Sequence, residues 1–407
     1  MTTSSAASAG PLQGVRVIEL GQLIAGPFCG KTLADFGAEV IKIEPPGKGD
    51  PLRKWRMLKN GNSVWWEVQS RNKQSVTLDL TQPEGQDILR ELVKEADVLI
   101  ENFRPGKMEE WGLGYGELKK LNPRLVMARI SGYGQDGPYC NRPGFGVIAE
   151  SMGGLRYLTA EPGRVPVRVG VSIGDTLAAL HGVIGILMAL YHRDRNHRDV
   201  PNGEGQVIDI ALYESVFNCM ESLLPEYSAF NAVREAAGSA LPGIVPSNAY
   251  PCRDGWILIG GNGDGIFKRL MKAIGRDEYA ASPDMASNDG RVKHVADIDG
   301  AITTWTKAHD KADALKILDE HDVPSGAIFS IADIAADAQY RAREMILNIT
   351  TRDGYTVDVP GIVPKLSATP GGIRNTAPRL GEDTEAVLQR AGLKAETIAD
   401  LRAKGVI

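Results

Sequence analysis

The sequence predicts an α/β protein, with a doubly wound, mostly parallel sheet in a large domain and a smaller α+β domain. Three observations support this fold class. β-Branched runs alternate with helical stretches through about the first 190 residues, as in parallel sheets covered by helices. The chain has 407 residues, more than one hydrophobic core usually holds. Beyond about residue 190 this alternation gives way to a charged segment and then to a different order of elements.

The first elements form a βαβ unit. Residues 15–20 (VRVIEL) read as a strand, a glycine-bearing turn follows, residues 28–37 read as a helix, and residues 38–44 as a second strand. A unit of this length implies parallel strands joined by a right-handed crossover. The alternation recurs downstream. Strands are expected at 75–80, 97–103 and 125–134, and a helix is expected at 83–96.

The later part of the chain is organised differently. Residues 192–205 are charged and poor in apolar side chains, which indicates a surface loop, and a helix is expected from about 209 to 234. Residues 248–261 (NAYPCRDGWILIGG) predict two short strands joined by a CRDG turn. Further helices are expected at 267–275, 301–308 and 311–321. We expect a first part of the large domain, a small α+β domain and a returning C-terminal part at 1–225, 226–335 and 336–407.

Composition and charge exclude several classes of function. The chain has 46 Lys plus Arg against 51 Asp plus Glu, a net charge of -5, which argues against nucleic acid and membrane surfaces as partners. Its four cysteines and six histidines are scattered, with no zinc-ligand spacing, as in a reducing cytoplasm without a metal site. The N-terminal tail lacks the features of a secretory signal. The longest apolar stretch, which follows residue 175, is interrupted by His181 and glycines and is expected to fall short of a bilayer span.

The glycine-rich turn at 21–32 (GQLIAGPFCGKT) resembles two nucleotide-binding motifs without matching either. A P-loop needs four residues between its first glycine and GK[ST], and only three separate Gly26 from Gly30. Gly21, Gly26 and Gly30 do not spell GxGxxG, so a dinucleotide site is equally incomplete. The layout still places a helix N-terminus at the carboxyl edge of a sheet, which favours an anionic or polar ligand.

Asp175 is a single carboxylate between Gly174 and a long apolar stretch. Asp is favoured at helix N-caps, so one interpretation is purely structural. The other is chemical, because the helix behind it is apolar on a wide arc and is expected to be largely buried. A partly desolvated carboxylate is a better nucleophile or base than one in water.

A family resemblance rests on motifs spread along the chain in a constant order, from about residue 11 to the C-terminus. They are GVRVIELGQLIAGPFCGKTLADFGAEVIKIEPPGKGDPLRKW, NKQSVTLDL, ENFRPG, LNPRLVMARISGYGQDGPY, VGVSIGDTLAALHGVIGILMAL, GQVIDIALYES and PKLSATPG. Together they resemble the class III coenzyme A transferases, the group of formyl-CoA, carnitine and dicarboxylate CoA-transferases. The resemblance implies a large domain formed by both chain ends, a smaller domain between them, and an interlocked homodimer.

The resemblance also implies roles for individual residues. The catalytic aspartate of the family lies in the GD that opens the long apolar helix, here Asp175, and attacks the donor thioester to form an anhydride and then an aspartyl-CoA thioester. A mobile active-site loop matches Gly260, Gly261, Asn262 and Gly263. Residues expected to line the path of coenzyme A are Leu23, Ile24, Ala25, Leu78, Asn102, Phe103 and Arg104, with Lys107 nearby.

Two departures from the family pattern bear on the substrate. Glu110 stands where several relatives place an arginine near the CoA phosphates, so that contact must come from Arg104, Lys107 or elsewhere. Ile24 stands where the formyl-CoA enzyme has a glutamine near the acyl group, which argues against formyl and oxalyl chemistry.

The expected reaction transfers coenzyme A from succinyl-CoA to a short dicarboxylate or an analogue such as a sulfinate acid. Coenzyme A thioesters are then substrates, and no permanent cofactor or metal is expected. A distal carboxylate needs an arginine or lysine partner. Six arginines lie near the motifs: Arg53, Arg56, Arg71, Arg142, Arg164 and Arg168.

Two other functions remain open at this point. The α-methylacyl-CoA racemases share this fold and use a histidine in a GHD segment, where this chain has Phe145 and Gly146. A non-catalytic CoA-binding protein is the other alternative. Retention of Asp175 and the glycine loop argues against it.

Overall fold

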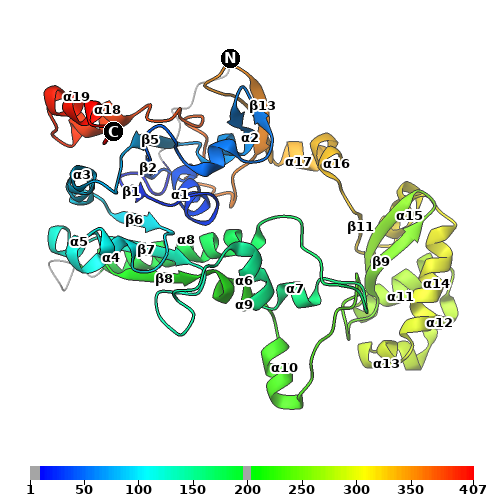
Figure 1. Cartoon of the computed structure of the whole chain (residues 1–407). Coiled ribbons are helices and arrows are strands. Elements are labelled where there is room, and N and C mark those ends of the chain that lie inside the picture. Colours follow the sequence, from blue (N-terminus) through cyan, green and yellow to red (C-terminus); the bar gives the residue numbers. More distant parts are fainter. Residues whose placement is uncertain (1–9, 196–202) are drawn as a thin grey trace. The chain divides into compact units, whose positions relative to one another are not determined.

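The computed structural model describes residues 10–195 and 203–407 and divides into two compact units (Figure 1). Unit 1 comprises Met1–Arg156, Arg168–Ala229 and Arg341–Ile407, and unit 2 comprises Tyr157–Val167 and Phe230–Tyr340. Unit 1 therefore combines early and late parts of the chain. The expected domain limits at 226 and 335 stay predictions. Nothing in the sequence indicated that residues 157–167 belong to unit 2.

Unit 1 is built on a six-stranded parallel sheet in the order β5-β2-β1-β6-β7-β8. Its β-branched strands pair in register, so that Ile18 lies between Ile41 and Leu99. The chain runs outward in one direction from β1 and then in the other from β6, which makes the gap between these strands a topological switch point. The strands are β1 (Arg16–Glu19), β2 (Glu39–Glu44), β5 (Lys73–Thr77), β6 (Val98–Glu101), β7 (Val126–Ser131) and β8 (Val207–Ala211).

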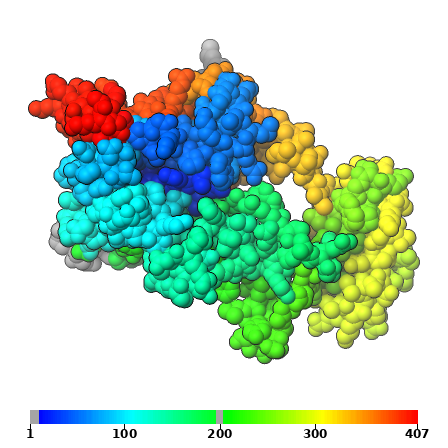
Figure 2. Space-filling model, viewed as in Figure 1, coloured from blue at the N-terminus to red at the C-terminus, as the bar shows by residue number. Residues whose placement is uncertain are grey.

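Both faces of this sheet are covered, because successive side chains of each strand point to opposite sides. Ile18 belongs to the core cluster on one face and Val17 to the cluster on the other. The helices with side chains in the first cluster are α3 (Pro83–Val93), α4 (Lys107–Glu110), α5 (Tyr115–Leu121), α18 (Thr384–Arg390) and α19 (Ala395–Ala403). Those in the second are α1 (Ala25–Asp35), α6 (Gly146–Met152), α8 (Ile173–Arg195) and α9 (Leu212–Phe217). Figure 2 shows the red C-terminal segment against blue and cyan N-terminal residues.

Shorter elements connect these parts. The segment after β2 contains a buried 3-10 turn capped by Asp50, a small hairpin and a helix capped by Ser63. The remaining elements from Pro51 to Phe230 are η1 (Pro51–Lys54), β3 (Leu58–Lys59), β4 (Asn62–Ser63), α2 (Val64–Gln69), α7 (Leu155–Leu158) and α10 (Leu223–Phe230). A late hairpin of unit 1 is formed by β12 (Ile346–Thr350) and β13 (Thr356–Pro360).

Unit 2 contains an antiparallel sheet in the order β11-β10-β9, covered by helices around its own core. The two strands expected on either side of the CRDG turn are present as β9 (Ser247–Cys252) and β10 (Gly255–Gly260). The other elements are β11 (Ser325–Ala327), α11 (Asp264–Ala273), α12 (Asp277–Ala281), η3 (Pro283–Met285), α13 (Asn288–Lys293), α14 (Val295–Lys307), α15 (Lys311–Glu320), α16 (Ile331–Ala336) and α17 (Ala338–Ala342).

Two expectations from the sequence were wrong in the region of α8. The helix expected at about 209–234 is instead strand β8 followed by α9 and α10, because the β-branched run VIDIA pairs with β7. The surface loop expected at 192–205 begins later, since α8 continues to Arg195 and the buried Arg193 pairs with Asp97 at 2.9 Å. Residues 196–202 lie outside the described part of the chain.

Helix α8 also corrects the expectation about membrane spans. Its 23 residues are long and apolar enough, by length and composition, to cross a bilayer, with a mean hydropathy of 1.8 in the most apolar window. The glycines and His181 do not shorten it. Its buried side chains, including Ala178 and Ile186, pack in the core cluster on the sheet, as those of a core helix do.

Candidate active site

A cavity of about 660 Å³ opens at the carboxyl edge of the parallel sheet in unit 1. Its walls come from the segments that follow β1, β6 and β7, so it lies over the switch point between β1 and β6. Ligands bind at this position in open α/β sheets, because the chain diverges there to either side. The main lining segments are 22–25, 102–105, 130–132 and 142–147, together with Arg168, Ser172 and Asp175.

Asp175 lies in the first turn of α8, which begins at Ile173. The interpretation of Asp175 as the N-cap residue is therefore not supported, because two helical residues precede it. Its carboxylate lies directly against Gly146, the first residue of α6, where a side-chain β-carbon would overlap it. Gly174 is also close to α6, because a β-carbon added there would lie 2.9 Å from the Gly146 carbonyl oxygen. The two glycines bring the start of α8 against the start of α6 and leave room for the carboxylate.

The surroundings of Asp175 disfavour its charged form. The pKa of Asp175 is raised to about 6, mainly by burial and also by the negative charge of Glu150, while the positive charge of Arg168 acts in the opposite direction. Glu150 is only 2% exposed, and its Oε2 lies 3.6 Å from the Arg168 Nε. Above pH 6 Asp175 is an ionised, poorly hydrated carboxylate at a helix N-terminus, which suits a nucleophile.

The turn after β1 is held by hydrogen bonds from two other segments. Leu23 has a φ of 63°, a left-handed conformation that is strained for a leucine. Its N–H donates to the carboxylate of Asp50, at 3.0 and 3.2 Å from the two oxygens. The Gln22 N–H donates to Asn102 Oδ1 at 2.8 Å, and the Asn102 amide donates back to the Gln22 carbonyl at 2.9 Å. These contacts present Leu23 and its neighbours to the cavity.

A buried group of charges supports this turn from below. The Lys42 ammonium lies 2.8 Å from Asp50 and 3.0 Å from Glu19, and it donates to the Gly21 carbonyl. The second carboxylate oxygen of Glu19 lies 2.7 Å from the Lys73 ammonium. Burial lowers the pKa of Lys73 to about 8, although Glu19 opposes this shift. Each buried charge thus has a partner, which is the condition for its burial.

Six of the eight residues expected on the CoA path line this cavity. The other two do not: Leu78 is 2% exposed within the core, and Lys107 pairs with Glu110 at 2.9 Å. Arg104 is exposed and has no ion-pair partner among the described residues. The roles of all eight in CoA binding stay predictions. The six that line the cavity are Leu23, Ile24, Ala25, Asn102, Phe103 and Arg104.

The expected active-site loop, residues 260–263, belongs to unit 2 and connects β10 to α11. The Gly260 N–H donates to the Pro324 carbonyl and the Gly261 N–H to the Pro246 carbonyl, both at 2.9 Å. An added β-carbon on Gly261 would lie 2.5 Å from the Leu270 side chain, so close packing requires glycine there. Asn262 is the exposed residue of the loop. The role of this loop at the nucleophile Asp175 stays a prediction.

Several lining residues were not singled out by the sequence. Trp55 and Trp65 form a tilted aromatic pair with ring centroids 6.3 Å apart, and both line the cavity. The WRM and VWW motifs that contain them were visible, but nothing in their spacing indicated a shared wall. Glu150 was also missed, because only the packing of α6 against α8 shows that it lies near Asp175.

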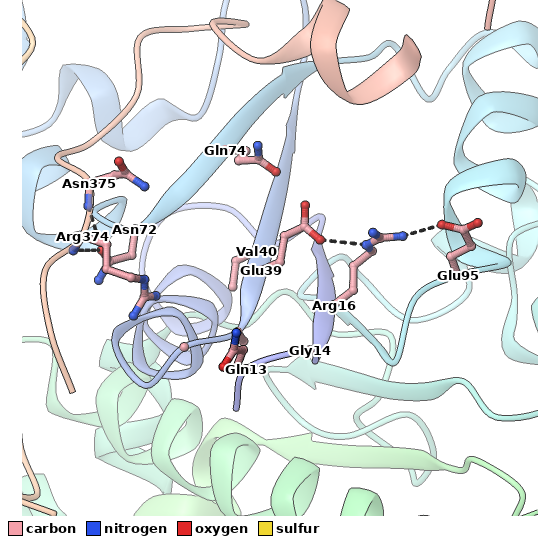
Figure 3. A pocket seen from close by; sticks show the side chains of 12 residues that line it. Gln13, Gly14, Arg16, Glu39, Val40, Asn72, Gln74, Glu95, Arg374 and Asn375 are labelled. Carbon is pink, nitrogen blue, oxygen red and sulfur yellow. Dashed lines mark hydrogen bonds and ion pairs between the residues drawn. The ribbon is translucent and has the colours of Figure 1, made fainter. Parts of the chain in front are cut away.

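A second cavity of about 630 Å³ lies at the amino edge of the same sheet (Figure 3). One of its two lining arginines, Arg16, lies between Glu39, at 2.9 Å, and Glu95, at 2.6 Å, and the other, Arg374, donates to the Ala34 carbonyl. The walls are mostly polar, and their two carboxylates, Glu39 and Glu95, are both engaged by Arg16. Within residues 10–195 and 203–407, no three His, Cys, Asp or Glu side chains are grouped as for a metal ion. The cavity at Asp175 is therefore the better candidate site.

Comparison with known proteins agrees with this geometry. The model of CoA-transferase family III matches residues 12–384. The chain belongs to this family. It is 48% identical to a succinyl-CoA–D-citramalate CoA-transferase of Chloroflexus aurantiacus, over 98% of both chains. It is 43% identical to the beta subunit of a succinyl-CoA–L-malate CoA-transferase of the same organism, again over 98% of both.

The fold is shared with a solved member. A CAIB/BAIF family protein from Brucella suis superposes with a TM-score of 0.81 at 34% identity, covering 94% of this chain and all of that one. The protein is thus a family III CoA-transferase, an enzyme whose substrates are a CoA thioester and a carboxylic acid. The resemblance noted from the motifs is confirmed.

Proposed function

We propose that this enzyme transfers coenzyme A from succinyl-CoA to a short dicarboxylic acid, with Asp175 as the nucleophile. The observation that carries the proposal is the ionisable carboxylate of Asp175, partly desolvated in a cavity at the carboxyl edge of the sheet. The names of the two Chloroflexus relatives support succinyl-CoA as the donor and a hydroxylated C4 or C5 diacid as the acceptor. A propionate that bears a sulfinate in place of the second carboxylate is a further candidate acceptor.

The reaction proceeds through four exchanges at Asp175. The carboxylate attacks the thioester carbonyl of succinyl-CoA, which forms a mixed anhydride and releases CoA thiolate. The thiolate attacks the aspartyl carbonyl, so that succinate leaves and an aspartyl-CoA thioester remains. The acceptor carboxylate attacks this thioester, and the released thiolate then attacks the acceptor carbonyl and regenerates Asp175. Each step exchanges one activated acyl bond, a thioester or an anhydride, for another, so no ATP is consumed.

Anhydrides hydrolyse, so the site must exclude water during these steps. Leu23, Ile24 and Ala25 are proposed to cover the pantetheine arm, and Asn102 and Phe103 its continuation. Arg104 is proposed as the phosphate contact, because Lys107 is engaged by Glu110. The loop at 260–263 is proposed, from the family resemblance, to close over the intermediate.

The racemase alternative is not favoured by any residue of the cavity. Racemisation by the expected route needs a histidine base, and no histidine stands among the residues described as lining the cavity. Phe145 and Gly146 occupy that place, and Gly146 has no side chain to move a proton. A non-catalytic CoA-binding role does not explain why a partly desolvated carboxylate, Asp175, lines the cavity.

We further propose that the enzyme is a homodimer in the cytoplasm. The outer side of α8 exposes apolar residues, of which Met188 is 66% and Tyr191 65% exposed. A surface of this kind on a long helix is typical of a covered interface. The interlocked dimer of the family would cover it with a second copy of this chain. The mass in solution, measured by sedimentation, tests this point.

One variant tests the mechanism directly. Asp175→Ala should abolish transfer yet leave a folded protein that binds CoA, because it removes the nucleophile but only one side chain from the first turn of α8. Wild-type enzyme treated with succinyl-CoA and hydroxylamine should give a hydroxamate at Asp175, located by mass spectrometry. Appreciable turnover by the variant, or a hydroxamate on another residue, would refute the covalent mechanism.

Two further measurements test the substrates. Full activity is expected in EDTA and without ATP or nicotinamide, because the reaction needs only CoA exchange. A panel of acids assayed with succinyl-CoA should favour hydroxylated diacids of four to six carbons. Preference for formate, oxalate, carnitine or an uncharged aryl acid would overturn the substrate assignment and leave the Asp175 mechanism in place.

A further inference from the structure

The six arginines near the family motifs differ sharply in their surroundings. Two are buried and fully engaged elsewhere. The Arg53 guanidinium lies 2.7 Å from Glu44 and 3.7 Å from the Trp66 ring centroid. Arg71 is fully buried and lies 2.7 Å from Asp35. Neither lines the cavity at Asp175, so neither can hold part of a substrate there.

Three other arginines are poorly placed to bind a substrate next to Asp175. Arg164 is exposed and belongs to unit 2, and it does not line the cavity. Arg56 and Arg142 line it, but each lies over an aromatic ring: Arg56 is 5.6 Å from the centroid of Trp65, and Arg142 is 3.8 Å from that of Tyr139. Neither makes an ion pair in the described part of the chain, and neither is among the charges that shift the pKa of Asp175.

Arg168 is the remaining arginine, and its charge acts on Asp175 directly. Its side chain is 39% exposed at the cavity wall. The Nε lies 3.6 Å from the Glu150 carboxylate, and Nη2 donates to the Ser172 hydroxyl at 3.3 Å. The Nη1 has no hydrogen-bond partner among the described residues. One edge of the guanidinium is therefore fixed by the protein and another is available to a ligand.

At this end of the cavity, one guanidinium acts on two carboxylates. Arg168 faces two carboxylates, Glu150 and Asp175, but makes an ion pair only with Glu150. Glu150 is almost completely buried, and its Oε1 has no hydrogen-bond partner in the described structure. Glu150 cannot leave the core to follow a ligand, so it acts as a fixed anchor that orients the guanidinium.

We propose that Arg168 binds the distal carboxylate of the dicarboxylic acyl group and so sets the preference for diacids, with Glu150 as its positioning residue. The inference rests on the proposed function and names the group that recognises the substrate class. A planar guanidinium with a free edge matches a carboxylate bidentately. The acyl chain of a short diacid then spans from Arg168 to Asp175, with its reacting carbonyl at the nucleophile.

The same residue serves both half-reactions. Donor acid and acceptor acid occupy the acyl site in turn, since each forms an anhydride with the one nucleophile. A single arginine therefore selects diacids on both sides of the exchange. Uncharged acyl groups of equal length lose this contact but keep every contact of the CoA moiety.

The test uses the first half-reaction alone, which isolates donor recognition. Full-length enzyme is mixed with succinyl-CoA or with butyryl-CoA, which has the same chain length and no distal carboxylate. The rate at which Asp175 gains the mass of CoA is followed by rapid-quench mass spectrometry. Wild type is expected to react roughly 10- to 100-fold faster with succinyl-CoA, the range for a hydrogen-bonded charge.

Arg168→Gln should abolish that preference by slowing the reaction of succinyl-CoA far more than that of butyryl-CoA, which loses only the effect of the Arg168 charge on Asp175. Arg168→Lys should restore part of it, and Arg164→Gln, which removes a charge four residues away and outside the cavity, should retain all of it. Glu150→Gln should weaken the preference through the KM for succinyl-CoA.

Three results are decisive against the proposal. Arg168→Gln could slow both donors equally, Arg142→Gln could remove the preference instead, or Arg168→Gln could leave the preference intact. A different failure belongs to the proposed function. If wild type gains no CoA mass at Asp175 from either donor, the aspartyl-CoA mechanism itself is wrong, whatever Arg168 does.

Discussion

The carboxylate of Asp175 occupies the space in which a β-carbon of residue 146 would stand. Gly146 opens α6 and Asp175 lies in the first turn of α8, so a glycine on one helix makes room for the nucleophile of the other. The position of the nucleophile therefore depends on Gly146, a residue that has no reactive group.

Gly146→Ala should therefore lower kcat far more than it lowers stability. The added methyl group displaces the Asp175 side chain, whose rotation is inexpensive, but a misplaced nucleophile reacts on the order of 100-fold more slowly. Gly116→Ala is the matched control, because nothing lies within 4 Å of its new β-carbon. Steady-state kinetics and thermal unfolding of both variants provide the comparison. Equal activities of the two variants would contradict the role assigned to Gly146.

The pH dependence of transfer should report the ionisation of Asp175. Its pKa is raised to about 6, first by burial and then by Glu150, so kcat/KM should rise with pH and level off above about 6. Glu150→Gln removes the neighbouring negative charge and should move this midpoint to lower pH. An unchanged midpoint in the variant would assign the titration to another group.

The same shift predicts how Asp175 affects stability. Because its pKa is higher in the folded than in the unfolded protein, ionisation lowers the free energy of unfolding as the pH rises from about 4 to 6. Asp175→Asn should thus be more stable than wild type at pH 8, by on the order of 1 kcal/mol, and no more stable at pH 4. Urea unfolding at both pH values measures this difference.

Asp50→Asn should weaken both folding and CoA binding. It removes the negative charge that pairs with Lys42 and weakens the acceptor for the Leu23 N–H. Removing one counter-charge of the buried Lys42 should lower the free energy of unfolding by about 3 kcal/mol. The strained turn at Leu23 also loses the hydrogen bond that holds it. We expect a lower free energy of unfolding and a higher KM for succinyl-CoA. If the KM is unchanged, the turn does not depend on Asp50.

Glu67 is predicted to be a second source of pH dependence, away from the cavity. Burial and the nearby charge of Asp353 raise its pKa to about 7, and its Oε2 has no hydrogen-bond partner in the described structure. Its ionisation should lower the free energy of unfolding as the pH rises from about 4.5 to 7. Glu67→Gln should then stabilise the protein at pH 8 by on the order of 2 kcal/mol, as measured in urea. The exposed Glu91→Gln should show no such gain.

Most of the parallel sheet was predictable, because its strands carry β-branched runs next to recognisable turns. β1, β2, β6 and β7 lie within the ranges expected from the sequence. β8 was not, because VIDIA is followed at once by a helical pattern and contains a polar residue. Only its pairing with β7 decides in favour of a strand, and that contact is tertiary.

The site was predictable only in part, for the same reason. Asp175 and the turn at Leu23 follow from motifs along the chain, which a resemblance can match. Glu150 and the close approach of Gly146 depend on how α6 packs against α8, and no local pattern encodes that. The sorting of the six arginines likewise needed their partners: Arg71 and Arg168 are indistinguishable as sequence, yet one is buried on Asp35 and the other lines the cavity.

The division of unit 1 between distant parts of the chain sets an order for folding during synthesis. Residues 230–340 form most of unit 2 and leave the ribosome before α18 and α19, whose side chains complete the core on one face of the parallel sheet. At about 5–20 residues per second, several seconds separate the two events. For that interval unit 2 can be complete while unit 1 still exposes apolar side chains on one face of its sheet.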